Sequence, residues 1–257
     1  MKKYISFSGG VESSAMCVLF GNKADAIFSD TGWEHKEIYD RIEFVERRVR
    51  EVHKNEFKVH RIRADAHHKG VSTPRLQDYI RETKYYPSQM GRYCTRMFKI
   101  EPIDEFLKGE GEVEIMIGLN ADEKDRTGNH GLLDNVKYSY PLIDANINRA
   151  GCKLVLERAG MLPSFPPYMQ RGGCVGCFYK SKKEFYAMAQ LSPDEFDEVV
   201  DIEKEIQDVR GKYYSIRKNI PSMDELGKLA RSSMFDADDM YGDYDLPETP
   251  CGVFCNR

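Results

Sequence analysis

Two of the seven cysteines in this chain have a spacing that suits metal or redox chemistry. Cys174 and Cys177 are separated by two residues in the segment GGCVGC, with glycines around them. Glycine permits the tight turn that brings two thiolates to one centre, as C-x-x-C pairs do in zinc and iron–sulfur sites. Disulfides are rare in reducing compartments. The pair therefore predicts a metal centre or a redox site.

A second segment suited to chemistry, SFSGGVESSAM, lies near the N-terminus. Gly9 and Gly10 follow a strand-like run and precede an apolar stretch, 15–20, that is typical of a helix. Glycines let the backbone approach a ligand closely, and the N–H groups and dipole at a helix start favour an anion. The pattern predicts a phosphate site, with a solvent-facing turn capped by serines as the alternative.

Strand-like and helix-like segments alternate around these residues. The segments ADAIFSD, FKVHRI and EVEIMIG have the apolar content of strands, and apolar residues recur at helical spacing from Ile38 to Val52. The order βαβαβ predicts an α/β fold with a doubly wound, mostly parallel sheet. Ligands of such sheets bind beyond the carboxyl ends of the strands. Those ends carry 8–10, 30–32 and 118–123.

The chain divides into three predicted parts. Residues 1–140 form the nucleotide-binding α/β domain, 141–234 a cysteine-containing helical part packed on it, and 235–257 an acidic tail with Cys251 and Cys255. Within the second part, Ser192 with Glu195 and Ser222 with Glu225 have the spacing of capping boxes. Residues 190–232 are therefore expected to form two helices.

The amino-acid composition limits the classes of protein to which this chain can belong. The chain is 41% apolar and 31% charged, which suits a globular protein with a buried core. There is no apolar run near the ~20 residues of a membrane span and no recognisable signal peptide, so we expect a cytoplasmic protein that does not bind membranes. The net charge of −4 argues against a protein that binds nucleic acid through its overall charge. Local clusters of basic residues could still contact nucleic acid.

Six segments, in order, resemble the PP-loop superfamily of adenine nucleotide α-hydrolases, and within it the phosphoadenosine phosphosulfate (PAPS) reductase-like family. They are SFSGGVESSAM, FSDTGWEHKEIYDRIEFV, RYCTRMFKIEPI, IGLNADEKDR, YPLID and GGCVGC. The matching region runs from 4 to 178, about two thirds of the chain. The resemblance implies a Rossmann-like sheet of the PP-loop type with a cysteine-containing helical extension.

The resemblance also implies roles for residues at the strand ends. The nucleotide-binding residues implied are Ser8, Gly9, Gly10, Glu12, Ser13, Ser14, Asp30, Thr31, Gly32, Gly118 and Glu123. Lys99 and Arg126, with Arg92, would supply positive charge to phosphate or sulfate oxygens. Glu123 would either ligate a metal or orient Arg126.

The glycine loop departs from the family pattern at two positions. Many members that cleave ATP have SGGKDS, whereas this chain has Val11 and Glu12 in place of lysine and aspartate. Glu12 could contact Mg²⁺ through one more methylene. Val11 cannot replace the charge of lysine, which argues against cleavage between the α- and β-phosphates of ATP.

The resemblance extends the cysteine pair to a predicted four-thiolate set. Cys94 lies where cluster-containing sulfonucleotide reductases have a pair of cysteines, but in this chain Tyr93 occupies the position of the other cysteine. Cys152 is therefore expected as the fourth ligand. The set of Cys94, Cys152, Cys174 and Cys177 suits a [4Fe–4S] cluster, while Zn²⁺ accepts the same ligands and a metal-free protein is the third alternative.

Cys251 resembles the late cysteine that acts as the nucleophile of sulfonucleotide reductases, although it could instead be a metal ligand. We therefore expect a PAPS reductase-like enzyme of sulfur metabolism or sulfur transfer, with Cys251, Lys99 and Arg126 as catalytic residues. Its nucleotide would be ATP, adenylyl sulfate or PAPS, and its partner a thiol reductant or a sulfur-donor protein. The alternatives are an ATP-dependent nucleic-acid modification enzyme, of the DNA phosphorothioation or tRNA thiolation type, and a non-catalytic, zinc-stapled nucleotide-binding protein.

Overall fold

The structure is a computed structural model that describes residues 1–63, 66–68, 71–128, 133–170, 173–217 and 220–232. Its centre is a five-stranded sheet in the order β3-β2-β1-β6-β7, and every neighbouring pair is parallel. The strands are β1 (Lys2–Ser6), β2 (Asp25–Ser29), β3 (Val59–Ile62), β6 (Val113–Met116) and β7 (Val136–Ser139). The predicted α/β class with a doubly wound parallel sheet is confirmed, and β7 is a strand that the sequence pattern did not indicate.

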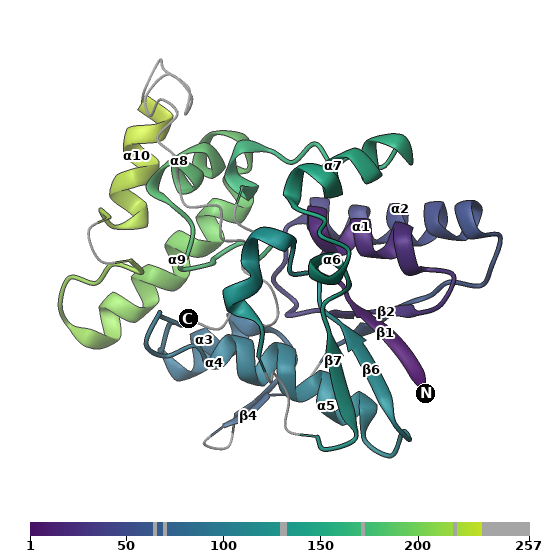
Figure 1. The fold of residues 1–257 in the computed structure, drawn as a ribbon. Helices are drawn as coiled ribbons and strands as arrows, with labels where there is room; N and C mark the ends of the chain where they lie inside the picture. The colour runs from purple at the N-terminus through teal and green to yellow at the C-terminus, as the bar shows by residue number, and fades with distance from the viewer. Residues whose placement is uncertain (64–65, 69–70, 129–132, 171–172, 218–219, 233–257) are drawn as a thin grey trace.

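Helices cover both faces of this sheet (Figure 1). Helices α1 (Val11–Phe20), α2 (Lys36–His53) and α7 (Arg149–Arg158) lie on one face, and α5 (Glu101–Leu107) lies on the other. Alternate residues of β1 explain the two layers, because Ile5 packs in the core under α1 and α2 while Tyr4 packs in the core under α5. The predicted stripe of α2 is buried at Ile38 and Val49, whereas Val52 in its last turn is exposed.

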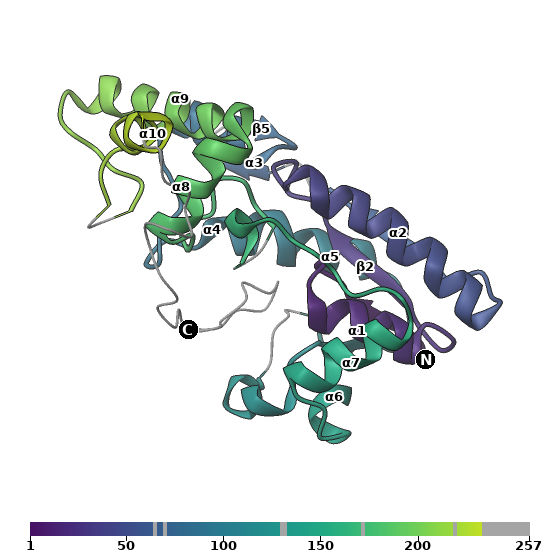
Figure 2. The ribbon, with the colours of Figure 1, turned by 90° about the horizontal axis from the view of Figure 1, so that it is seen from above.

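The remaining elements extend the carboxyl edge of the sheet and build the helical part. They are β4 (Ala66–His68), β5 (Val71–Thr73), α3 (Leu76–Thr83), α4 (Tyr93–Thr95), η1 (Arg96–Ile100), η2 (Ala121–Arg126), α6 (Pro141–Asp144), η3 (Pro167–Met169), α8 (Lys182–Leu191), α9 (Pro193–Arg210) and α10 (Met223–Ser232). Figure 2 shows α8, α9 and α10 gathered at one end of the molecule. The domain boundaries at 140 and 234 stay predictions, and 235–257 lies outside the described residues.

The two helices expected between 190 and 232 are present as α9 and α10, but only one expected capping box forms. At α10, Glu225 N donates to Ser222 Oγ and Ser222 N donates to Glu225 Oε2. At α9, Ser192 Oγ instead donates to Glu195 Oε2 at 2.9 Å, because this carboxylate also contacts His35 of the sheet domain. Among the described residues, no helix is both long and apolar enough to cross a membrane.

A buried carboxyl group in α9 holds the loop that leads to α10. Glu203 is 1% exposed, and its two oxygens accept hydrogen bonds from Ile216 N at 2.9 Å and Met223 N at 2.5 Å. Burial, which penalises the charged form, raises the pKa of Glu203 to about 7. The folded protein therefore holds this proton more tightly than the unfolded chain does.

We expect Glu203 to make the free energy of unfolding fall as the pH rises from about 4.5 to about 7, because stability falls with pH where the folded state binds more protons. The Glu203→Gln variant cannot ionise and should lose this slope in urea titrations. It should also lose about 1 kcal/mol at pH 5, because the NH2 group of the amide cannot accept a hydrogen bond, whereas the hydroxyl oxygen of the neutral acid can. Asp208→Asn, on the exposed side of α9, is the control and should keep the slope. An unchanged slope in Glu203→Gln would contradict the assignment.

Candidate functional site

The SGG loop connects the end of β1 to the start of α1. Gly9 has φ +79°, a conformation that favours glycine, and a Cβ added there would lie 3.3 Å from Ile38 Cδ1 of α2. Gly10 is the N-cap of α1 and provides no side chain to its first turn. The first N–H groups of an α-helix have no partner within the helix. The backbone donors at this turn are therefore available in the way an anion site requires.

The three predicted serines of the loop have different roles. Ser8 N donates to Ser13 Oγ at 3.2 Å, and the hydroxyl oxygens of Ser8 and Ser13 also lie 3.2 Å apart. Ser14 is fully buried, and its hydroxyl donates to Gly9 O at 3.5 Å. Ser8 and Ser13 thus lie together at the loop, while Ser14 holds the turn from inside.

The segment after β6 closes against the SGG loop. A Cβ added at Gly118 would lie 3.3 Å from Ser13 N, so the absence of a side chain allows the two backbones to approach. Beyond it, Glu123 Oε2 accepts bonds from the backbone N of Asn120 at 3.3 Å and from its Nδ2 at 3.0 Å. Glu123 Oε1 accepts a bond from Arg126 Nη1. This ion pair is compatible with the expected role of Glu123 in orienting Arg126, and both roles expected for Glu123 stay predictions.

The segment after β2 is fixed by its own carboxylate. Asp30 accepts hydrogen bonds from Gly32 N at 2.8 Å, from Tyr39 Oη at 2.8 Å and from Arg63. Gly32 has φ +73°, and the chain of Arg75 lies against it. Sequence reasoning missed Arg63, although its position directly after β3 was the signal.

Glu12 is already paired in this structure. Its carboxylate side chain is 8% exposed and accepts a bond of 2.6 Å from Arg149 Nη1 of α7. Cys152 lies one turn further along α7 and is fully buried. Burial, with a smaller effect of the Glu12 carboxylate, raises the pKa of Cys152 to about 12. Cys152 thus lies within the packed core, and both its predicted role as a metal ligand and the expected contact of Glu12 with Mg²⁺ stay predictions.

The C-x-x-C segment pairs with the turn between β2 and α2. Glu34 and Cys174 form an antiparallel bridge, in which Val175 N donates to Trp33 O at 3.0 Å. Cys174 Sγ donates to Glu34 Oε1 at 3.3 Å, and Thr31 Oγ1 donates to the same oxygen at 2.8 Å. The structure thereby joins Thr31 to the cysteine pair.

No three of the four predicted thiol ligands have sulfur atoms within 4.8 Å of one another. In the described part of the chain, one group of three or more His, Cys, Asp or Glu side chains has ligand atoms within 4.8 Å of one another, and it contains none of these cysteines. Cys152 packs in the core cluster with α1 and α2, whereas Cys174 contacts Glu34. We derive no chemistry through a cluster or a zinc ion at these residues, and ligation by Cys94, Cys152, Cys174 and Cys177 stays a prediction.

Three cations lie around the cysteine pair and the sheet edge. Ser29 Oγ donates to Lys99 O at 3.0 Å, which places η1 beside the end of β2. The Arg92 guanidinium lies 5.8 Å from the ring centre of Tyr179, and among the described residues its buried Nε and Nη2 have no hydrogen-bond partner. Lys180, which the sequence places in a local basic cluster open to nucleic-acid contact, is 1% exposed and donates to Tyr168 O at 2.5 Å. Burial lowers the pKa of Lys180, opposed by Glu184 and then by the two nearby thiols.

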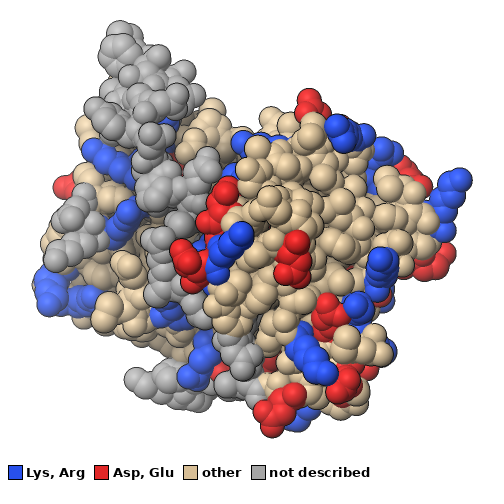
Figure 3. Space-filling view, in the orientation of Figure 1, with Lys and Arg blue, Asp and Glu red and all other residues tan. Residues whose placement is uncertain are grey.

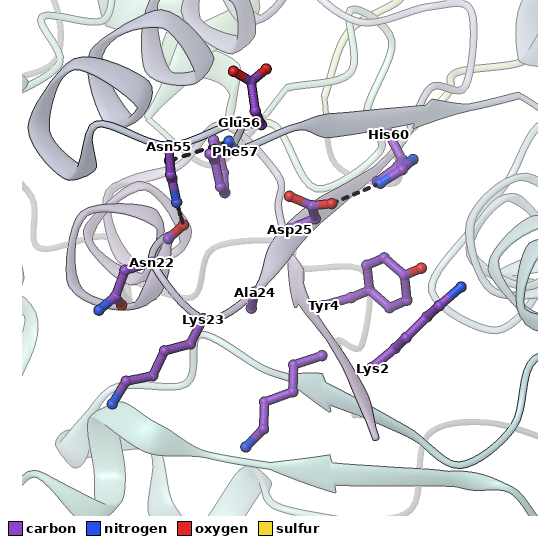
Figure 4. Close-up of a pocket in the computed structure, with 12 residues that line it drawn as sticks. Lys2, Tyr4, Asn22, Lys23, Ala24, Asp25, Asn55, Glu56, Phe57 and His60 are labelled. Carbon is purple, nitrogen blue, oxygen red and sulfur yellow. Dashed lines mark hydrogen bonds and ion pairs between the residues drawn. The ribbon is translucent and has the colours of Figure 1, made fainter.

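The described surface also has a pocket at the opposite end of the sheet (Figure 4). Its volume is about 460 Å³, and it is lined by Lys2, Lys3, Tyr4, Gly21, Asn22, Lys23, Ala24, Asp25, Asn55, Glu56, Phe57 and His60. Two of the lining side chains contact each other, with His60 Nε2 and Asp25 Oδ2 3.3 Å apart. Since β1 and β2 begin at this pocket, it is separate from the SGG loop.

We expect Gly176→Ala to destabilise the docking of the C-x-x-C segment. Its new Cβ would lie 2.1 Å from Trp33 Cη2 and 2.3 Å from the Tyr86 hydroxyl, and both rings are buried. Overpacking of this kind costs about 1–3 kcal/mol. Urea unfolding should show this loss, and Cys177 should react faster with a thiol reagent. The control is Gly111→Ala, where the added Cβ meets nothing within 4 Å. Equal stability of the two variants would contradict the packing described here.

The chain is similar to a curated protein and, more weakly, to a solved structure. An uncharacterized protein of Methanocaldococcus jannaschii is 26% identical over 238 residues, which are 87% of this chain and 54% of that protein. The chain thus spans about half the length of this curated relative. A crystal structure of PAPS reductase from Candida auris, a phosphate complex, matches with a TM-score of 0.43 and 16% identity, over 63% of this chain and 74% of that one.

A family model gives the assignment. The model of the phosphoadenosine phosphosulfate reductase domain matches residues 2–148, which is more than half of the chain. This range contains the SGG loop, the segment after β2 and the segment after β6, whose contacts are described above. The chain belongs to the phosphoadenosine phosphosulfate reductase domain family.

Proposed function

We propose that this protein is a sulfonucleotide reductase-like enzyme that binds adenylyl sulfate or PAPS at the carboxyl edge of its sheet. Family membership supports a nucleotide-binding function related to sulfur. The observation that carries the proposal is the geometry of the SGG loop. Gly9, with φ +79°, allows the chain to turn from β1 into α1, and the N-cap of α1 is Gly10, which has no side chain. This turn suits a phosphate that accepts bonds from the backbone.

Charge around the loop supports a sulfated or phosphorylated ligand. The salt bridge to Glu123 orients the Arg126 guanidinium, and both side chains are 12% exposed. A fixed guanidinium suits two oxygens of one oxyanion better than a freely moving ammonium does. In the proposed site, Arg126 and Lys99 neutralise the phosphate and sulfate oxygens of the nucleotide.

The proposed reaction is an attack by the Cys251 thiolate on the sulfate sulfur. The new S–S bond forms as the bond from sulfur to the bridging phosphate oxygen breaks, and the electron pair of that bond leaves with the adenosine phosphate. The enzyme then carries a thiosulfonate on Cys251. A protein dithiol reduces it with two electrons, which restores the Cys251 thiol, releases sulfite and leaves the partner as a disulfide. Cys251 lies outside the described residues.

Two observations favour this reaction over ATP-dependent modification of nucleic acid. Val11 is 8% exposed and belongs to the apolar core, so the loop provides no cation where ATP-cleaving members have lysine. Positive and negative side chains are interspersed over the described part of the face in Figure 3, and the chain carries a net charge of −4. A nucleic acid would be favoured by a continuous basic surface.

We expect Gly9→Val to weaken binding of adenylyl sulfate at least about 10-fold, because a Cβ and a branched side chain would block the backbone approach at the loop. Isothermal calorimetry measures this. Gly109→Val is the matched control: Gly109 also has a positive φ, +84°, but an added Cβ there meets nothing within 4 Å. It should show the same backbone strain with unchanged affinity. Equal affinities of Gly9→Val and the wild type would contradict the proposed binding site.

A second prediction concerns the covalent intermediate. Incubation with adenylyl sulfate, or with its 3′-phosphorylated form, should add one sulfonate to Cys251, detected by mass spectrometry of the intact protein and its peptides. Cys255→Ser should be labelled like the wild type, and Cys251→Ser should not be labelled. Labelling that persists in Cys251→Ser would refute the role of Cys251. If neither compound labels the wild type although both bind, the reductase reaction is wrong.

A further inference from the structure

A group of three potential metal ligands lies where the helical part meets the sheet domain. His35 is the N-cap of α2, Glu37 is in its first turn, and Glu195 is in the first turn of α9. One ligand atom from each residue lies within 4.8 Å of the others. The two sides of the group come from segments that are 160 residues apart in the chain.

Burial distinguishes this group from ordinary surface carboxylates. His35 is fully buried, and among the described residues its Nε2 atom has no hydrogen-bond partner. Glu37 Oε2 is likewise excluded from solvent and without a partner. Buried polar atoms are nearly always bonded, so two such atoms in one cluster indicate that a partner is missing. Glu195, with 24% of its side chain exposed, gives a route by which an ion could enter.

Neighbouring groups hold the two carboxylates in position. Tyr168 Oη donates to Glu37 Oε1 at 2.7 Å, and Ser192 Oγ donates to Glu195 Oε2 at 2.9 Å. His35 Nδ1 lies 2.5 Å from the same Glu195 oxygen. Metal ligands are commonly oriented by such outer hydrogen bonds. The ammonium of Lys180 acts on this cluster too, so two carboxylates and one cation leave an excess negative charge that a divalent ion would offset.

We propose that His35, Glu37 and Glu195 bind one divalent transition-metal ion of the Zn²⁺ class. An imidazole with two carboxylates is a ligand set that suits such ions, and a water molecule can fill the fourth position. A tetrahedral ion with bonds of about 2.1 Å needs donors roughly 3.4 Å apart, which small side-chain rotations within this group achieve. The ion would connect the start of α2 to the start of α9. This site is separate from the predicted four-cysteine set and independent of the proposed reductase reaction.

The test uses the full chain after removal of metals with a chelator, followed by titration with Co²⁺ and, by competition, with Zn²⁺. We expect one equivalent of Co²⁺ per chain and a visible spectrum without the strong sulfur-to-cobalt charge-transfer band that thiolate ligands give. Glu37→Gln and Glu195→Gln should weaken binding by about 100-fold or more, and Tyr168→Phe by roughly 10- to 100-fold, the usual cost of losing an outer hydrogen bond. Zn²⁺ should raise the melting temperature of the wild type but not of Glu37→Gln.

The matched control is Glu198→Gln. Glu198 also lies in α9 and contacts the same turn, through a bond of 2.7 Å from Trp33 Nε1, but it is outside the ligand group. It should bind Co²⁺ as tightly as the wild type. Because Glu195→Gln could unfold the protein, Glu37→Gln, whose described side-chain bond is to Tyr168 alone, decides the result. Absence of Co²⁺ binding, wild-type affinity in Glu37→Gln, or a thiolate band that disappears in Cys174→Ser would each overturn the proposal.

Discussion

The pairing between the C-x-x-C segment and the turn after β2 is the contact on which the candidate site depends. Two backbone bonds, Val175 N to Trp33 O and His35 N to Gly173 O, connect segments that are about 140 residues apart. Gly176 allows the rings of Trp33 and Tyr86 to pack directly against this backbone. Because buried backbone groups must be bonded, separating the two segments would expose several donors and acceptors at once. The helical part is therefore held at the carboxyl edge of the sheet, beside the SGG loop.

This contact places the cysteine pair close to a carboxylate and a buried ammonium. Cys174 donates to Glu34, and Lys180 is buried close enough for its charge to act on both thiols. The proposed ligands of a divalent ion, His35, Glu37 and Glu195, lie beside the same turn. The turn from Thr31 to Glu37 thus connects the nucleotide edge, the cysteine pair and the start of α9.

The local parts of the structure could be predicted from the sequence, and the long-range pairings could not. The periodicity of α2 and the apolar runs of β1 and β6 specify their elements, and a parallel sheet brings their carboxyl ends together, so the approach of Gly118 to Ser13 followed from pattern alone. The partners of Glu12 and His35 are 137 and 160 residues away, and no local pattern encodes them. The four-cysteine set was inferred from the C-x-x-C spacing and the family resemblance, and the burial of Cys152 of α7 in the core depends on tertiary packing.

The nucleotide is proposed to bind at the SGG edge of the sheet and not in the lysine-lined pocket at the opposite end of the strands. Hydrogen–deuterium exchange with and without adenylyl sulfate tests this directly. We predict that the nucleotide slows exchange in peptides covering 7–14 and 117–126, while peptides covering 21–25 and 55–60, which line the opposite pocket, are unchanged. Protection confined to 21–25 and 55–60, or no protection at a saturating nucleotide concentration, would contradict the account.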